Sequence, residues 1–198
     1  SVVSGGATIT SPNLFNTGLT ALNPGVNVLQ WTIGNGVCAN SSSTVSIQRD
    51  LNPTVVDAGP NQSLCAVAGT TMSANAPAIG TGNWSVISGG GNFLTPNSPL
   101  TSVVAIPVGL NVYQWTISNG VCPSSTSTMS VLRVSPPTPS LPGPNQVICN
   151  STATMSANLP AIGSGTWTLL SGIATIVSPN SPNTTITGLG FGINIFEW

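Results

Sequence analysis

Charged side chains are almost missing from this sequence of 198 residues, which has two basic residues, three acidic residues and no histidine. Binding to nucleic acid or to anionic lipid depends on clustered lysine and arginine, so neither partner is expected. Paired carboxylates, a general base and a metal-ligand set are also absent, so we expect no enzyme activity, no metal and no cofactor. No apolar run reaches the roughly 18 residues of a membrane span, so this segment should not insert into a membrane.

A repeat of about 84 residues is what the sequence does contain. Residues 30–38, QWTIGNGVC, return at residues 114–122 as QWTISNGVC. Residues 71–84, TMSANAPAIGTGNW, return at residues 154–167 as TMSANLPAIGSGTW. The two arginines, Arg49 and Arg133, keep the same spacing. The chain is therefore a tandem array.

One complete repeat occupies residues 51–135. Residues 1–50 match its C-terminal strands, and residues 136–198 match its N-terminal strands. Because neither end falls at a domain boundary, we expect the chain to be a segment of a longer protein.

Glycine and proline, 22 and 17 residues, are spread along the chain and argue against long helices. Short β-rich runs between turn signals predict an all-β sandwich of the immunoglobulin (Ig) type. Seven strands are expected in the complete repeat, namely residues 62–67, 70–74, 83–88, 92–95, 101–106, 110–118 and 121–134.

The recurring Asn-Gly pair in each copy of the QWTI phrase predicts a two-residue type I′ hairpin turn. The pairs are Asn35-Gly36 and Asn119-Gly120. Such a turn sets Ile117 opposite Cys122, and the alternation of the strand places both on the core face. We therefore expect Cys122 to point into the interior.

The tryptophans occur in phase with aliphatic residues, which predicts that they belong to the core. Exposed aromatics that stack on sugar rings are the alternative interpretation of the same residues. The expected core residues are Trp31, Trp84, Trp115, Trp167, Trp198, Tyr113 and Ile117.

Four cysteines, without CxxC spacing or histidine, predict structural disulfides and an oxidising compartment. We predict a Cys65–Cys122 bond inside the complete repeat, because the first and last strands of such sandwiches often lie side by side. Cys38 and Cys149 would then pair outside this segment. The rival pairing is Cys38–Cys65 with Cys122–Cys149, which would link adjacent repeats.

The two junctions between repeats, residues 49–61 and 133–145, are short and contain proline. Proline favours extended backbone, so these linkers should be semi-rigid and the repeats should form a rod.

The motifs GPNQ-x-x-C, G-x-G-x-W and N-x-x-x-W-T-I-x-N-G-x-C resemble the tandem Ig-like or PKD-like repeats of large Bacteroidota cell-surface proteins. That family includes gliding-motility adhesins and type IX secretion substrates. The resemblance implies an extracellular, cell-attached filament or adhesin stalk, whose partners are neighbouring repeats and, through lateral association, other copies. The alternative is a carbohydrate-binding or accessory module of a large secreted hydrolase.

Overall fold

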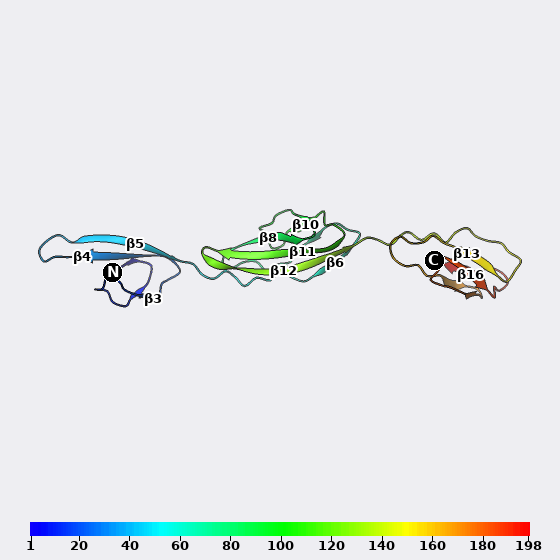
Figure 1. Ribbon diagram of the computed structural model, residues 1–198, viewed down its shortest axis with the longest axis horizontal. Coiled ribbons are helices and arrows are strands. Elements are labelled where there is room, and N and C mark those ends of the chain that lie inside the picture. Colours follow the sequence, from blue (N-terminus) through cyan, green and yellow to red (C-terminus); the bar gives the residue numbers. More distant parts are fainter. The chain divides into compact units, whose positions relative to one another are not determined.

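The computed structural model describes residues 1–198, and it contains strands and turns but no helix (Figure 1). The predicted all-β, Ig-like class is therefore confirmed. The chain forms two compact units, Ser1–Arg133 and Val134–Trp198. The first unit holds the first partial repeat and the complete repeat, and the second unit holds the third repeat.

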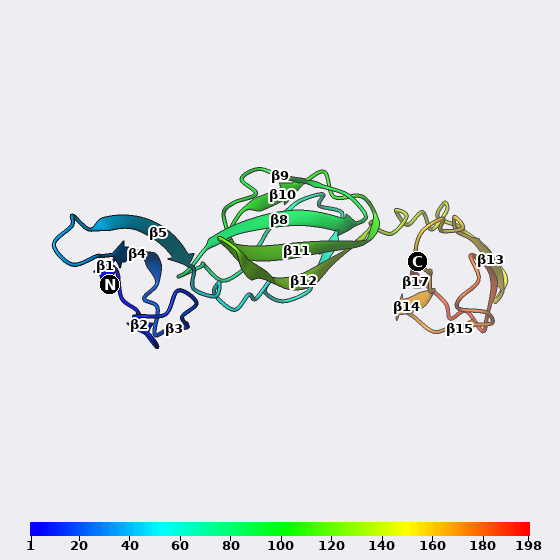
Figure 2. The same ribbon diagram turned by 60° about the vertical axis from the view of Figure 1, so that its left-hand side comes forward.

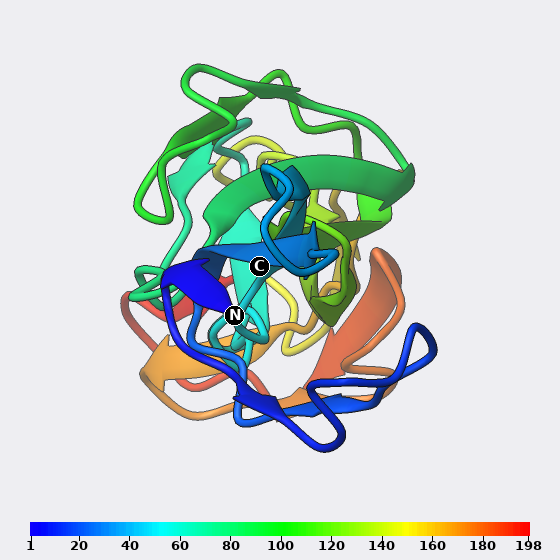
Figure 3. The ribbon, with the colours of Figure 1, turned by 90° about the vertical axis from the view of Figure 1, so that its left-hand side faces the viewer.

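The complete repeat is a sandwich of two sheets, and all seven predicted strands are present in it (Figure 2). One sheet has the order β6-β12-β11-β8, and the other has the order β7-β10-β9. The strands are β6 (Gln62–Cys65), β7 (Thr70–Thr71), β8 (Thr81–Ser88), β9 (Asn92–Phe93), β10 (Ser102–Val104), β11 (Gly109–Asn119) and β12 (Cys122–Val134). The long strands twist, as the curved ribbon of β8 shows in Figures 2 and 3.

Strict alternation along β11 builds the core of this sandwich. Tyr113, Trp115 and Ile117 are fully buried, while the residues between them face outward. The Trp115 ring lies 5.3 Å from that of Trp84, its partner on β8. The Trp115 indole Nε1 donates to the Asn75 carbonyl at 3.2 Å. Phe93 on β9, in the other sheet, stacks on Trp84 at 5.6 Å and meets Tyr113 edge-on at 5.3 Å, so these aromatic rings connect the two sheets.

The G-x-G-x-W motif is explained by this core. Gly80 has a φ of 95°, which residues with a side chain rarely adopt. A Cβ atom on Gly82 would collide with the indole ring of Trp115. The first glycine therefore allows the turn into β8, and the second allows Trp115 to pack against the strand.

An asparagine recurs near the start of the strand that carries the QWTI phrase in all three repeats, fully buried as Asn27 and Asn111 and partly buried as Asn194. The Asn111 amide donates to the carbonyls of Pro107, Gly109 and Val131 and accepts from the Gly90 N–H at 3.0 Å. Asn27 in the first repeat and Asn194 in the third make corresponding bonds to their own loops. Since buried polar groups are costly without partners, this residue specifies the loop conformation in each copy.

The first partial repeat contains the strands that correspond to the second half of the sandwich. Strands β1 (Val2–Ser4), β4 (Gly25–Ile33) and β5 (Ser41–Arg49) form one sheet, and β2 (Thr8–Ile9) pairs with β3 (Leu19–Thr20). The long β4–β5 hairpin corresponds to β11–β12 of the complete repeat.

The third repeat contains the strands of the first half. Strands β13 (Ala153–Ser156), β16 (Asn183–Thr187) and β15 (Thr175–Ile176) form one sheet. Strands β14 (Thr168–Ser171) and β17 (Ile195–Glu197) form the other. Trp167 is buried between them, 5.3 Å from the ring of Trp198.

Candidate functional site at the two ends of the complete repeat

The chain enters the complete repeat beside the tip of the β11–β12 hairpin, which we call the proximal end. The Asp50 carboxylate accepts a hydrogen bond from the Val121 N–H at 3.0 Å. The Asn119 side chain donates to the Leu51 carbonyl at 2.9 Å. The linker and the hairpin tip are therefore joined by two hydrogen bonds between residues about 70 positions apart.

The Asp50 carboxyl group at this end has a lowered pKa. Its pKa lies below the ordinary value of 3.8, first because the Gln48 amide donates to Oδ1 at 2.7 Å and then because Val121 donates to Oδ2. Both donors favour the charged form. The carboxylate is thus held ionised at any pH near neutrality.

The hairpin turn itself differs from the predicted type I′ turn. Asn119 pairs with Cys122, and the turn residues are Gly120 and Val121. Only Gly120 has a positive φ, of 53°, as in a type II′ turn. Ile117 lies opposite Ser125, because an extra residue on β12 forms a bulge next to Pro123. Cys122 therefore lies half-buried at the tip and not in the core.

The first repeat shows the same turn. The Asn35 carbonyl accepts from the Cys38 N–H at 3.1 Å, and Gly36 has a φ of 58°. Strand pairing stops at Ile33 and Ser41, so the tip of this hairpin is an open loop.

The next part of the linker is bound to the loop before β8. The Thr54 hydroxyl accepts from the N–H groups of Ala78 and Ile79, at 2.9 and 2.8 Å. The Asn75 side chain donates to Val55 and accepts from the Asp57 N–H at 2.8 Å.

The third repeat repeats this arrangement. Thr138 accepts from the N–H groups of Ala161 and Ile162, and Asn158 bonds to Pro139 and Leu141. Sequence reasoning assigned these polar residues to ordinary loops. The signal that could have identified them is the 83- or 84-residue recurrence of a threonine in the linker and an asparagine in the loop.

The distal end, where the chain leaves the complete repeat, is held by Arg133. Its guanidinium donates to the carbonyls of Ala66, Val67 and Ile106 at 2.9 to 3.1 Å. Arg49 makes the equivalent bond to the Leu22 carbonyl in the first repeat, at 2.7 Å. The only two basic side chains therefore have the same structural task, which the sequence indicated by their spacing but did not explain.

A tight turn at Cys65, Ala66 and Val67 completes the distal end. Ala66 has a φ of 67°, and the Val67 N–H donates to the Cys65 carbonyl at 2.8 Å. This is a γ-turn of the rare, strained kind, and such strain persists only where surrounding bonds impose it. Here the Arg133 guanidinium binds the two carbonyls that follow Cys65 and so holds the turn in place.

The predicted Cys65–Cys122 pair is not brought together by this fold. Asn61, before β6, accepts from Ser130, and the residues after β6 accept from Arg133, so β6 runs parallel to the end of β12. Cys65 lies next to that end, whereas Cys122 begins β12. Eleven residues of strand, about 35 Å, separate the two ends of β12. A disulfide requires the two Cα atoms to lie within roughly 7 Å of each other.

All four cysteines, Cys38, Cys65, Cys122 and Cys149, are free thiols in the structure. The adjacency of the first and last strands was predicted correctly, but their parallel direction was not. A cysteine at the end of β6 therefore marks the distal end of the sandwich, and a cysteine at the start of β12 marks the proximal end.

The tryptophans expected in the core have different environments. Trp84, Trp115 and Trp167 are at most 2% exposed, and Trp198 is half-buried. Trp31 is 40% exposed in this chain, in which the strand equivalent to β8 is represented only from Ser1 onward, so its core position in a complete repeat stays a prediction. In the complete repeat β8 covers the equivalent Trp115, whereas β1 pairs with β4 only at Val28 and Leu29.

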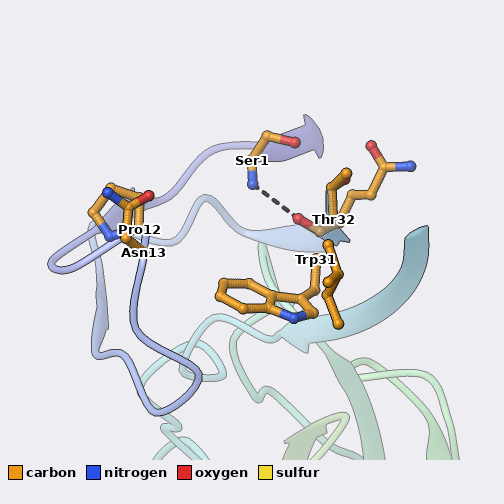
Figure 4. Close-up of a pocket in the computed structure, with 7 residues that line it drawn as sticks. Ser1, Pro12, Asn13, Trp31 and Thr32 are labelled. Atoms are coloured by element: carbon orange, nitrogen blue, oxygen red, sulfur yellow. Dashed lines mark hydrogen bonds between the residues drawn. The ribbon is translucent and has the colours of Figure 1, made fainter. Parts of the chain in front are cut away.

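Trp31 instead lines a shallow pocket of about 360 Å³ with Ser1, Pro12, Asn13 and the end of β4 (Figure 4). The terminal amine of Ser1 donates to the Gln30 carbonyl at 2.8 Å in this pocket. A single aromatic ring with neutral neighbours is a poor platform for a sugar, because the row of aromatics that such platforms use is missing around it.

No cluster of metal-ligating side chains occurs in the chain. The chain also lacks any helix with the length and hydropathy that crossing a membrane would require.

No family model and no curated protein matches the sequence. One similar solved structure is a PKD domain studied in solution, which is 24% identical with a TM-score of 0.36. The match covers 46% of this chain and 92% of the PKD domain. The Ig domains 1–4 of Sidekick-1 are 16% identical, with a TM-score of 0.45, and the match covers 95% of this chain and 57% of theirs. The insect immune protein hemolin is 16% identical, with a TM-score of 0.38, and the match covers 82% of this chain and 49% of hemolin. At these identities the likeness concerns the fold alone.

Proposed function

We propose that the chain is a structural segment of an extracellular filament or adhesin stalk, in which Ig-like repeats in series provide reach and stiffness. The observation that carries this proposal is the double attachment of the linker. Asp50 and Leu51 are bonded to the hairpin tip, and Thr54 and Asp57 are bonded to the loop before β8. A linker that is bound along its length transmits force and orientation better than a free one.

The resemblance to Bacteroidota surface repeats supports a cell-attached role in adhesion or motility. The Thr138 and Asn158 contacts in the third repeat support it as well, because they attach the second linker to its repeat in the same way as the first. These contacts support a structural role for the joints between repeats.

The test measures how rigidly the linker holds the first repeat to the complete repeat, by NMR residual dipolar couplings on the full chain. Wild-type couplings from β4–β5 and β11–β12 should fit one alignment tensor. The double variant Asp50→Asn, Asn119→Ala should need two tensors. Asp57→Asn is the control, since its carboxylate bonds only to the nearby Gly59 N–H. Two tensors in the wild type would contradict a stiff joint.

A glycan array with the same chain addresses the carbohydrate-binding alternative. Binding that is lost in Trp31→Ala without loss of folding would favour that alternative over the structural one.

A further inference from the structure

The two hairpin tips each contain an asparagine followed by a glycine, and the sequence has no other such pair. Asparagine is among the thermolabile residues of proteins. The backbone nitrogen of the following residue can attack the side-chain amide, and glycine hinders this approach least because it has no side chain. The two pairs occur in nearly the same sequence, IGNGVC at residues 33–38 and ISNGVC at residues 117–122. Their intrinsic reactivity should therefore be the same.

The linker holds the second of these pairs on both sides of the bond where attack would occur. Asn119 is half-buried, and its side-chain amide donates to the Leu51 carbonyl at 2.9 Å. The Asp50 carboxylate lies against Gly120, where an added Cβ atom would collide with it, and accepts from the Val121 N–H at 3.0 Å. The Asn119 amide therefore has to leave its partner on the linker before it can turn toward the Gly120 nitrogen.

We propose that Asn119 is a site of spontaneous deamidation that its contact with the linker protects, and that deamidation there releases the linker from the hairpin tip. The modification concerns the chemistry of the tip, so it does not depend on the proposed role of the repeats in a stalk.

The reaction needs only water as a co-reactant. The Gly120 nitrogen attacks Cγ of Asn119, so that a new C–N bond forms and the bond from Cγ to Nδ2 breaks. Ammonia leaves and takes up the proton of the Gly120 N–H. Water then opens the cyclic imide, which gives aspartate or isoaspartate. No general base or cofactor is required.

The product cannot keep the linker contact. A carboxylate has no hydrogen to donate to the Leu51 carbonyl, which now accepts from Asn119. It would also add a second negative charge at the tip that Asp50 already occupies. Asp50 itself is held ionised, because donors at Gln48 and Val121 lower its pKa. Like charges at one site repel each other, so the deamidated tip should lose the linker.

Mass spectrometry of the full chain during incubation at mildly alkaline pH tests the protection. Asn35, which is exposed at the tip of its hairpin in this chain, is the internal reference. In denaturant the two asparagines should deamidate at the same rate. In the folded chain Asn119 should react at least about fivefold more slowly than Asn35, the effect of one ordinary hydrogen bond that has to open first. Equal rates in the folded chain would overturn the proposal.

Asp50→Ala tests whether the linker is the protecting element. In this variant the rate at Asn119 should rise toward the rate at Asn35, and the rate at Asn35 should not change. Asp57→Ala is the matched control, since that carboxylate bonds only to the nearby Gly59 N–H, and it should leave both rates unchanged. An unchanged rate at Asn119 in Asp50→Ala, with native circular dichroism, would overturn the proposal.

A second measurement tests the release and does not depend on the folding of Asp50→Ala. Asn119→Asp places the product at the tip, and it should accelerate hydrogen exchange of the Val121 amide by about fivefold or more. Asn119→Ala, which loses the bond without adding a charge, should accelerate it less. Exchange as slow in Asn119→Asp as in the wild type would overturn the release. None of these measurements reports the rigidity of the joint, so the proposed function and this inference can fail separately.

Discussion

Replacing Trp115 by alanine tests the core that joins the two sheets, and the chain supplies its own comparison. Trp115 is fully buried, whereas Trp31, at the same place in the first repeat, is 40% exposed. A buried tryptophan removes on the order of 200 Å² from water, worth about 5 kcal/mol at ~25 cal/mol per Å². After allowance for the alanine that remains, Trp115→Ala should cost about 3–5 kcal/mol, the usual range for a core aromatic.

Trp31→Ala should cost less, about 2 kcal/mol, because two fifths of its surface is already in water and the space it leaves is open to solvent. Native-state hydrogen exchange separates the two effects, since it reports the stability of β11 and β4 individually. In thermal melts a loss of 3 kcal/mol corresponds to at least about 12 °C for a domain of this size.

Equal losses of stability in the two variants would refute the packing argument. So would a loss below about 1 kcal/mol in Trp115→Ala. Trp115→Phe is the conservative control: it keeps an aromatic ring but removes the indole N–H that donates to Asn75, and it should cost about half as much.

Four further predictions follow from the structure. Gly82→Ala should destabilise the complete repeat by about 1–3 kcal/mol in urea titrations, because the new methyl group would collide with Trp115; no loss would mean that the ring does not lie against β8. The pKa of Asp50 is lowered on folding, so its contact with the hairpin tip contributes to stability above about pH 4 and is lost as the pH falls through the lowered pKa. Hydrogen exchange of the Val121 amide should therefore accelerate at that acid pH in the wild type, and Asp50→Asn should show no such acceleration. The melting temperature should be flat between roughly pH 5 and 9, since the pKa shifts of Asp50 and Tyr113, the latter raised by burial, both act outside that range; a change above about 10 °C would contradict this. Panels of peptide, ester and polysaccharide substrates should show no turnover, and turnover abolished by one serine or aspartate substitution would refute the structural role.

The strands and the main core could be predicted because their signals are local. Alternation along residues 109–119 identifies the buried face, and the aromatic residues at Tyr113 and Trp115 mark its centre. Glycines in the G-x-G-x-W motif stand where a turn and a close ring contact need them. These features depend on neighbours within a few residues, so periodicity is enough to find them.

The features that escaped prediction depend on partners far along the chain. The bonds of the hairpin tip to Asp50 and Leu51 join residues about 70 positions apart and have no local signal, whereas the one-residue shift of the turn also occurs in the first repeat. The direction of β6 relative to β12 has no local signature, so the cysteine at its end was placed at the wrong end of the sandwich. The role of Arg133 is similarly hidden, because its three acceptors are backbone carbonyls and leave no trace in the composition.

The use of both arginines on backbone carbonyls has a consequence for how the protein responds to salt. Added electrolyte weakens a fold or a contact by screening interactions between exposed charges, over about 10 Å at 0.1 M and about 3 Å at 1 M. The distal end has no ion pair to screen, because the acceptors of Arg49 and Arg133 are neutral dipoles. The proximal end is likewise a carboxylate bonded to neutral donors. The hydrogen bonds at the two ends of the complete repeat should therefore be equally stable at low and at high salt concentration.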